Sequence, residues 1–348
     1  MDRVEADTLV LRCGRCDREF AGSPRALDCP RCHDAAVLLP QIKLQTDLLY
    51  PVTSDGIWKF AAALPPVPRE HQISLGEGGT PLIELRDGAI RVKFEGNNPT
   101  QSYKDRFSAV NVSVAKWWDV AGVALISTGN AGLAAAAYGA AAGIPVRVLC
   151  SPSTPAFITR GIRDFGADLR TGDPTELRRG LEESISGGYL PGSRSVPFTS
   201  VTPFGSDGYT TIAYEIAAEL GDAPAAVVVP VGGGDGIYGV GRGFRQLFDS
   251  GLTSRMPTLY GARTTSSRAP SISGDAVGEH AIATVADSGG RLVDVVESRM
   301  IAAVGVLAEH GLSAEPASST SVAAALDLGL ADVVCVVTGG GLKWRELV

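Results

Sequence analysis

The strongest constraint on the fold of this chain comes from two short apolar runs that each end in a glycine-rich loop. Residues 122–126 (GVALI) lead into residues 127–132 (STGNAG), and residues 226–229 (AVVV) lead into residues 230–236 (PVGGGDG). Each run has the length of a buried strand, and the glycines favour a flexible turn before a helix. Free N–H groups at such a helix start bind anionic groups. Either loop alone is a weak indication, but the pair favours an α/β chain that holds an anion.

Strand-like and helix-like stretches alternate along most of the chain. This alternation is typical of parallel sheets with covering helices, so we predict an α/β fold with two open parallel-sheet domains. We assign residues 108–198 to a small domain and residues 41–107 with 199–348 to a large one, after a separate module at residues 1–40. The predicted strands are 90–95, 123–126, 146–150, 227–229 and 333–337, and the predicted helices include 131–142, 159–165 and 209–220.

Four of the six cysteines form two Cys-x2-Cys pairs near the start of the chain. Cys13 and Cys16 are separated from Cys29 and Cys32 by twelve residues that include a turn-forming Gly-Ser-Pro. Four thiolates at this spacing suit a tetrahedral zinc ion in a small ribbon. The alternatives are a pair of disulfides, which an intracellular protein disfavours, and a ribbon without metal. We predict a structural zinc.

Composition limits the partners of this chain. The net charge of −7 argues against a nucleic-acid footprint, and no apolar run is long enough to span a membrane. The first residues also lack the apolar region of a signal peptide. We therefore expect a cytoplasmic protein whose partners include neither nucleic acid nor membrane.

A single lysine occupies an unusual position between these features. Residues 98–107 (NPTQSYKDRF) form a polar turn that places Lys104 in the first turn of a helix. The helix dipole is positive there, so an ammonium is disfavoured. Lys104 is then either solvated or poised for imine chemistry. From these residues alone, a solvated surface lysine is the simpler interpretation.

The lysine turn and the two glycine loops, in this order, resemble the pyridoxal-phosphate (PLP) enzymes of the tryptophan-synthase-β fold type, and threonine synthases most closely. Residues 76–82 (GEGGTPL), 315–319 (EPASS) and 338–343 (TGGGLK) match further motifs of that family. The resemblance covers almost the whole chain. It implies a fold-type-II enzyme of amino-acid biosynthesis that uses PLP, acts on a small amino acid and forms a homodimer.

The resemblance also implies the role of each site residue. Lys104 would form a Schiff base with PLP and then move protons at Cα of the substrate. A neutral hydroxyl at Thr338 would leave the ring nitrogen largely unprotonated. The implied sites are the phosphate seat (Gly232, Gly233, Gly234, Gly236), the contact to the ring hydroxyl (Asn130), the contact to the ring nitrogen (Thr338) and the grip on the substrate carboxylate (Ser127, Thr128).

Several residues depart from the family pattern. Gln101 stands where the family usually has glycine, and Asp235 puts a carboxylate inside the phosphate loop, where we expect it to point outward or to cap the helix. Thr199 and Gly205 replace the asparagine and arginine that hold the substrate phosphate in threonine synthases. An arginine fork is the usual way to recognise phosphate, so its loss suggests another leaving group. The candidates to replace it are Arg160, Arg163 and Arg194.

These residues favour elimination or replacement at Cβ or Cγ of a small amino acid, on a threonine-synthase-like framework. The alternatives are a serine or threonine dehydratase and a β-replacement enzyme similar to cysteate or cysteine synthase, since neither needs a phosphate site. A catalytically silent relative is a further alternative, but Lys104, Asn130 and Thr338 argue against it. A hydrolase has no support, because His33 lies in the ribbon and the other histidines show no triad context and are interpreted as surface or capping residues (His71, His280, His310).

Overall fold

The computed structural model describes residues 10–13, 16–23, 29, 31–32, 38–40, 56–85, 88–192, 204–274 and 277–347. They form two compact units. The first contains the described parts of residues 1–45, 52–77 and 104–208, and the second contains those of residues 78–103 and 209–348. The predicted α/β class with parallel sheets is confirmed. The predicted domain boundaries stay a prediction.

A six-stranded sheet forms the centre of the second unit. Every neighbouring pair of strands is parallel except the edge pair β4–β5. The valine-rich strand β13 is buried along its whole length, as a strand covered on both faces must be. The strand order is β12 (Arg291–Asp294), β11 (Thr258–Arg263), β10 (Ala226–Pro230), β13 (Val333–Val337), β5 (Ile90–Phe94) and β4 (Leu82–Leu85).

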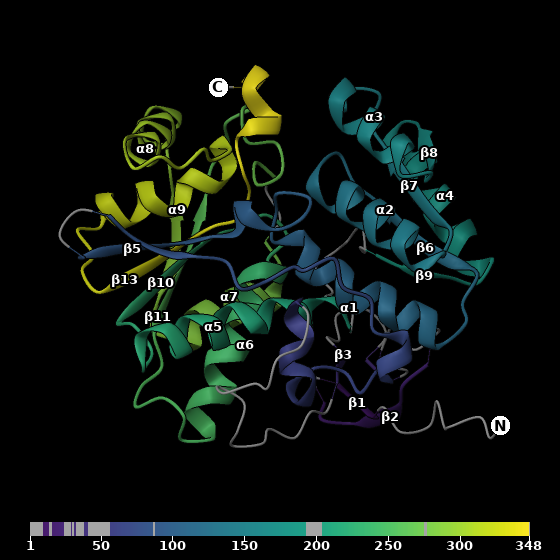
Figure 1. The fold of residues 1–348 in the computed structure, drawn as a ribbon, viewed down its shortest axis with the longest axis horizontal. Coiled ribbons are helices and arrows are strands. Elements are labelled where there is room, and N and C mark those ends of the chain that lie inside the picture. The colour runs from purple at the N-terminus through teal and green to yellow at the C-terminus, as the bar shows by residue number, and fades with distance from the viewer. Residues whose placement is uncertain are drawn as a thin grey trace. The chain divides into compact units, whose positions relative to one another are not determined.

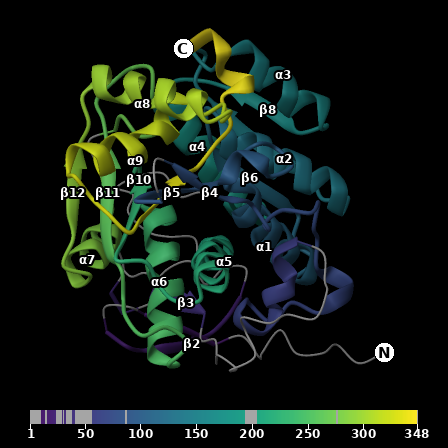
Figure 2. The ribbon, with the colours of Figure 1, turned by 60° about the vertical axis from the view of Figure 1, so that its left-hand side comes forward.

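Helices cover both faces of this sheet (Figure 1, Figure 2). Helices α8 (Glu297–Glu309) and α9 (Pro316–Asp327) lie on one face, and α9 packs on β10, β11 and β13. On the other face lie α5 (Thr210–Leu220), α6 (Asp235–Asp249) and α7 (Glu279–Asp287). Buried alanines of α9 and buried valines of β13 share one apolar core, which fixes the strand ends that carry the site.

The first unit contains a parallel sheet and a small antiparallel one. The parallel sheet has the order β8 (Asp168–Thr171), β7 (Val146–Cys150), β6 (Gly122–Ile126) and β9 (Tyr189–Pro191). Helices α1 (Lys104–Trp117) and α2 (Asn130–Ala142) pack on one face with α3 (Ala156–Asp164), and α4 (Pro174–Ser186) lies on the other (Figure 1). The antiparallel sheet joins β2 (Glu19–Ala21), β1 (Val10–Cys13) and β3 (Leu38–Pro40). The 3-10 helices are η2 (Gly56–Ala63), η3 (Arg69–His71), η4 (Glu95–Asn97), η5 (Gly205–Tyr209) and η6 (Leu342–Leu347).

Within the described ranges, no helix combines the length and the apolar character that crossing a membrane requires.

A buried cation ties β5 to α5. Lys93 is fully buried, and its Nζ lies 3.1 Å from Oε2 of Glu215 and 2.6 Å from Oε1 of Glu219. We expect Lys93→Met to lower the free energy of unfolding by about 3 kcal/mol, because it removes the cation that balances the buried charge of Glu215. Chemical denaturation measures this loss. Lys93→Met/Glu215→Gln should recover much of it, and a single variant as stable as the wild type would contradict the expectation.

Candidate active site

The carboxyl ends of three neighbouring strands carry the motifs found in the sequence. In the order β10, β13, β5, these strands lead into the second glycine loop, into Thr338 and into the turn before Lys104. Their registers pair Val228 with Cys335 and Cys335 with Val92, so the three ends lie at the same edge of the sheet. Ligands bind at such edges of open parallel sheets.

Tyr103, which directly precedes Lys104, joins the other two motifs. Its backbone N–H donates to the carbonyl oxygen of Thr338 at 2.9 Å. Its ring lies against Gly236, where a Cβ atom would come within 2.7 Å of the ring, so a larger residue at that position would displace it. Tyr103 therefore holds the start of α6 and the end of β13 together, and the chain continues from it into Lys104.

The backbone of residues 76–82 (GEGGTPL) binds buried side chains. Gly78 N–H donates to Oδ1 of Asn98 at 2.9 Å, and Gly79 N–H donates to Oε1 of Glu215 at 2.8 Å. Glu77 is buried, and its Oε2 accepts a hydrogen bond of 2.7 Å from the Tyr138 hydroxyl. Burial raises the pKa of the Glu77 carboxyl. The glycines of this motif thus serve to bring backbone N–H groups onto buried side chains.

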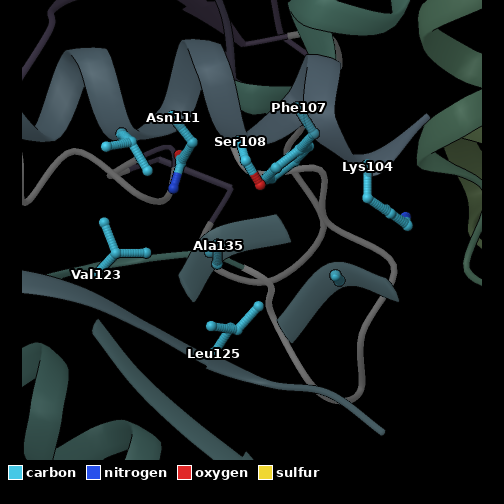
Figure 3. Close-up of a pocket in the computed structure, with 10 residues that line it drawn as sticks. Lys104, Phe107, Ser108, Asn111, Val123, Leu125 and Ala135 are labelled. Atoms are coloured by element: carbon cyan, nitrogen blue, oxygen red, sulfur yellow. The ribbon is translucent and has the colours of Figure 1, made fainter. Parts of the chain in front are cut away.

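Lys104 is the first residue of α1, as the sequence predicts. It lines a small cavity in the first unit, where α1 faces β6 and α2. Figure 3 shows Phe107, Ser108 and Asn111 along one side of this cavity, with Val123 and Leu125 of β6 opposite them. Asn111 is not among the site residues predicted from the sequence, although its spacing of seven residues from Lys104 places both on one face of a helix.

Asn111 gives the cavity a polar group. Its side chain is buried, and Nδ2 lies 3.4 Å from the carbonyl oxygen of Pro191, to which it donates. Its Oδ1 is buried and makes no hydrogen bond among the described residues. A buried carbonyl oxygen in this state costs about 1–3 kcal/mol, which a donor entering the cavity would offset.

Phe107 fills the space next to Gly205. A Cβ atom at Gly205 would lie 2.4 Å from the Phe107 ring, so a larger side chain cannot occupy that position without moving the ring. The arginine absent from this position therefore has no room in the structure. Arg160 and Arg163 are exposed on α3. Thr199 and Arg194 lie outside the described residues.

The first glycine loop uses its serine internally. The Ser127 hydroxyl accepts hydrogen bonds from Gly132 N–H at 2.9 Å and from Gly129 N–H at 3.3 Å. Thr128 is exposed, and Asn130 is the first residue of α2. Ser127 thus shapes the turn, so binding of an anion here relies on backbone N–H groups at the start of α2.

A chain of hydroxyl groups reaches Thr338 from a buried carboxylate. Ser318 Oγ donates to Oε1 of Glu315 at 3.0 Å and lies 2.9 Å from Oγ1 of Thr338. A serine hydroxyl has one proton, so the Thr338 hydroxyl donates to Ser318. The sequence indicates a neutral hydroxyl at this position but not the direction of its proton.

Gln101, at the position where the family usually has glycine, adopts a backbone conformation that favours glycine. Its φ is +60°, in the left-handed region that costs most residues about 1–2 kcal/mol. Gly340 N–H donates to the Gln101 carbonyl oxygen at 2.9 Å, which holds the turn in this conformation. The turn before Lys104 therefore holds a non-glycine residue in the left-handed region.

Two residues beside the second glycine loop bear on the expectations from sequence. Asp235 begins α6, but the helix has no side-chain cap, so Asp235 is not a capping residue. His280, interpreted from sequence as a surface or capping histidine, is buried, with 3% of its side chain exposed. That interpretation is wrong because α7 folds its first turn against the glycine loop.

The cysteine pairs form a compact cluster in the antiparallel sheet region. The sulfur atoms of Cys13, Cys16, Cys29 and Cys32 all lie within 4.8 Å of one another, and all four are free thiols. Burial alone would raise the pKa of Cys29, but backbone hydrogen bonds from Arg31 and Cys32 outweigh it and lower that pKa to about 7. The pKa of Cys32 is raised to about 12, foremost by its hydrogen bond with Cys16. Cys29 is thus ionised more easily than Cys32.

Comparison with known proteins matches residues 73–339 to the family described as pyridoxal-phosphate dependent enzyme. The threonine synthase of Methanosarcina acetivorans is 31% identical, over 97% of this chain and 93% of that protein. The threonine synthase of Halalkalibacterium halodurans is also 31% identical, over 82% of this chain and 88% of its own length.

Solved structures agree on the fold. An aspartate racemase that depends on pyridoxal 5'-phosphate superposes with a TM-score of 0.65 at 19% identity, over 77% of this chain and 92% of that one. The serine racemase of maize superposes with a TM-score of 0.64 at 17% identity, over 77% and 91% of the two chains. At these identities the likeness concerns the fold alone.

Proposed function

Because this chain belongs to the family of pyridoxal-phosphate-dependent enzymes and is a lyase of the threonine-synthase type, we propose that it eliminates or replaces an unphosphorylated group at Cβ or Cγ of a small amino acid. The observation that supports this proposal is the position of the Phe107 ring. It occupies the place beside Gly205 where an arginine would be needed to bind a substrate phosphate. The proposal keeps the family's class of substrate, a small amino acid, and changes the leaving group.

The residues at the strand ends fit PLP. The cofactor, when bound, supplies an electron sink for negative charge at Cα. Gly232, Gly233, Gly234 and Gly236 would hold its phosphate on backbone N–H groups at the start of α6. The absence of bulky side chains fits this role, because a Cβ atom at Gly232 would come within 2.4 Å of the Ser271 carbonyl oxygen.

The remaining residues would position the ring and the substrate. Lys104 would hold the cofactor and then take and return the proton at Cα. Thr338 would place its hydroxyl at the ring nitrogen and would donate to it in place of Ser318. Asn130 would contact the ring hydroxyl, and the loop of Ser127 and Thr128 would bind the substrate carboxylate through backbone N–H groups.

The cavity beside Lys104, of about 10 Å³, has room for one water-sized group, and it suits a group that can donate a hydrogen bond. Oδ1 of Asn111 is an acceptor, and the Ser108 hydroxyl lines the same space. A phosphate dianion has only acceptor oxygens and would be repelled by the Asn111 carbonyl. A hydroxyl or amino group can donate to it. The described lining residues of this cavity include one cation, Lys104, which the reaction itself requires.

A substrate panel tests the proposal. The purified enzyme is incubated with L-serine, L-threonine, O-acetyl-L-serine, O-phospho-L-serine and O-phospho-L-homoserine. Elimination is followed through keto acid and ammonia, and replacement through new amino acids formed in the presence of sulfide or sulfite. We expect turnover of at least one unphosphorylated substrate. Turnover restricted to the two phosphorylated substrates would contradict the proposal.

We also propose that the four cysteines of the N-terminal sheet hold one structural zinc ion. Tetrahedral zinc with Zn–S bonds of about 2.3 Å requires sulfur atoms roughly 3.8 Å apart. The Cys16–Cys29 and Cys13–Cys32 sulfur pairs lie 3.7 and 4.0 Å apart. The donor set therefore fits the ion in both chemistry and spacing.

Metal analysis tests this site. We expect the wild type to contain about one zinc per chain and Cys13→Ser/Cys29→Ser to contain none, because two thiolates bind zinc far more weakly than four. Cys150→Ser is the matched control, since that cysteine is buried in β7 away from the cluster. Full zinc content in the double variant would show that the cluster is not the site.

A further inference from the structure

A buried histidine lies against the second glycine loop. Gly278 N–H donates to the Gly233 carbonyl oxygen at 2.9 Å, which holds the start of α7 on the loop. Nε2 of His280 then lies 3.5 Å from the position of a Cβ atom on Gly234, whose φ is +110°. The imidazole is thus a direct neighbour of the loop that the proposed function assigns to the cofactor phosphate.

The imidazole of His280 has no hydrogen bond on either nitrogen among the described residues. The edge-on Tyr238 ring, 5.2 Å away between centroids, offers it an aromatic contact instead. Two buried nitrogen atoms without hydrogen bonds cost free energy. A hydrogen-bonding partner or a bound proton recovers part of that cost. A purely structural position would be filled at lower cost by an apolar side chain.

Asp235 supplies the partner. Its Oδ1 lies 3.6 Å from Nε2 of His280, just beyond hydrogen-bond distance, and its side chain is 34% exposed. Asp235 also stands in the first turn of α6, where its negative charge competes with a phosphate for the helix dipole. An imidazolium at His280 would cancel that charge, whereas a neutral imidazole leaves it in place.

We propose that His280 and Asp235 form a proton-linked pair that adapts the glycine loop to a phosphate dianion. When the phosphate binds, one proton moves from solvent to His280, the imidazolium pairs with Asp235, and the loop no longer opposes the ligand. His280 acts through Asp235 and is a positioning residue. The inference rests on the proposed phosphate seat but not on the identity of the amino-acid substrate.

Other charged groups lie on the elements that pack against His280. From its own helix, Glu279 precedes it in the first turn of α7. From α6, Arg242 lies over the Tyr238 ring at 5.7 Å. From β11 and β12, Arg263 and Asp294 pair with each other. Asp235 is therefore the charged group that the structure places closest to the His280 ring.

The experiment compares ligands with and without a phosphate group. Pyridoxine 5'-phosphate and pyridoxine are titrated by calorimetry into full-length protein freed of cofactor; neither ligand has an aldehyde that could react with Lys104. The titrations are run from pH 6 to pH 8, in two buffers of different ionisation enthalpy at each pH. The proteins are the wild type, His280→Gln and Asp235→Asn, and thermal melting confirms that each is folded.

We expect the wild type to take up more protons than His280→Gln on binding pyridoxine 5'-phosphate, by up to about one. Because the proposed pair gains a proton when the phosphate binds, wild-type affinity should fall more steeply with rising pH than that of His280→Gln. At pH 6, His280→Gln should bind roughly tenfold more weakly, the effect of one lost charge pair. At pH 8, Asp235→Asn should bind more tightly than the wild type, since the opposing carboxylate is gone.

Pyridoxine should show none of these differences. Equal proton uptake by the wild type and His280→Gln would overturn the inference, and so would an equal loss of affinity for both ligands, which indicates a structural role. Failure of the wild type to bind pyridoxine 5'-phosphate would instead refute the phosphate seat itself and this inference with it.

Discussion

Lys104→Ala is expected to remove both the visible absorption of the bound cofactor and the activity of the enzyme. Bound PLP absorbs visible light through its Schiff base with a lysine, and Lys104 is the lysine at the start of α1 that follows directly on Tyr103. The same side chain serves as the base at Cα, and losing a positioned base alone costs about 10²–10⁴ in rate. Absorption spectra and turnover of the best substrate measure both losses.

Lys116→Ala is the matched control, because Lys116 lies in the last turn of the same helix. It should keep the wild-type spectrum and rate. Thermal melting of both variants separates loss of chemistry from loss of folding. A colourless wild type that stays colourless with added PLP would contradict the cofactor assignment, and a coloured Lys104→Ala variant would move the Schiff base to another lysine.

The strands and the position of the lysine could be predicted from the sequence because their signals are local. The valine-rich run that became β13 and the strand at 146–150 are continuous apolar stretches with turn residues at their ends. The polar turn before Lys104 also indicates a helix start. The helix α3 begins earlier than predicted, at Ala156, since residues before its apolar positions still take part in the first turn.

The rest of the site depends on contacts between residues far apart in the chain. Nothing near Gly205 indicates that Phe107 fills its side-chain space. Likewise, His280 follows a polar segment that is typical of a surface, but the hydrogen bond from Gly278 to Gly233 buries it. The direction of the Thr338 hydroxyl depends on Glu315, which precedes a different helix and reaches Thr338 only through Ser318. Tertiary packing, not propensity, decides each of these.

The ratio of specificity constants for unphosphorylated and phosphorylated substrates decides the identity of the leaving group. We expect the specificity constant for O-phospho-L-homoserine to be at least about a hundredfold below that for the best unphosphorylated substrate. Each charge-assisted hydrogen bond to a phosphate contributes roughly 1.5–3 kcal/mol, or about tenfold to a hundredfold in affinity. Thr199 and Gly205 remove two such partners relative to threonine synthases. Steady-state kinetics on both substrates measure the ratio.

Three variants test whether the Phe107 ring beside Gly205 is the reason for this preference. Gly205→Arg alone should not improve use of the phosphorylated substrate, because the Phe107 ring lies 2.4 Å from the Cβ position and the new side chain has no room. Phe107→Ala/Gly205→Arg vacates that space, so it should raise the specificity constant for O-phospho-L-homoserine roughly tenfold over Phe107→Ala alone. Phe107→Ala is the control for changes in packing. A wild-type value of about 10⁴ M⁻¹s⁻¹ or higher for this substrate lies in the ordinary enzyme range and would make the chain a plain threonine synthase.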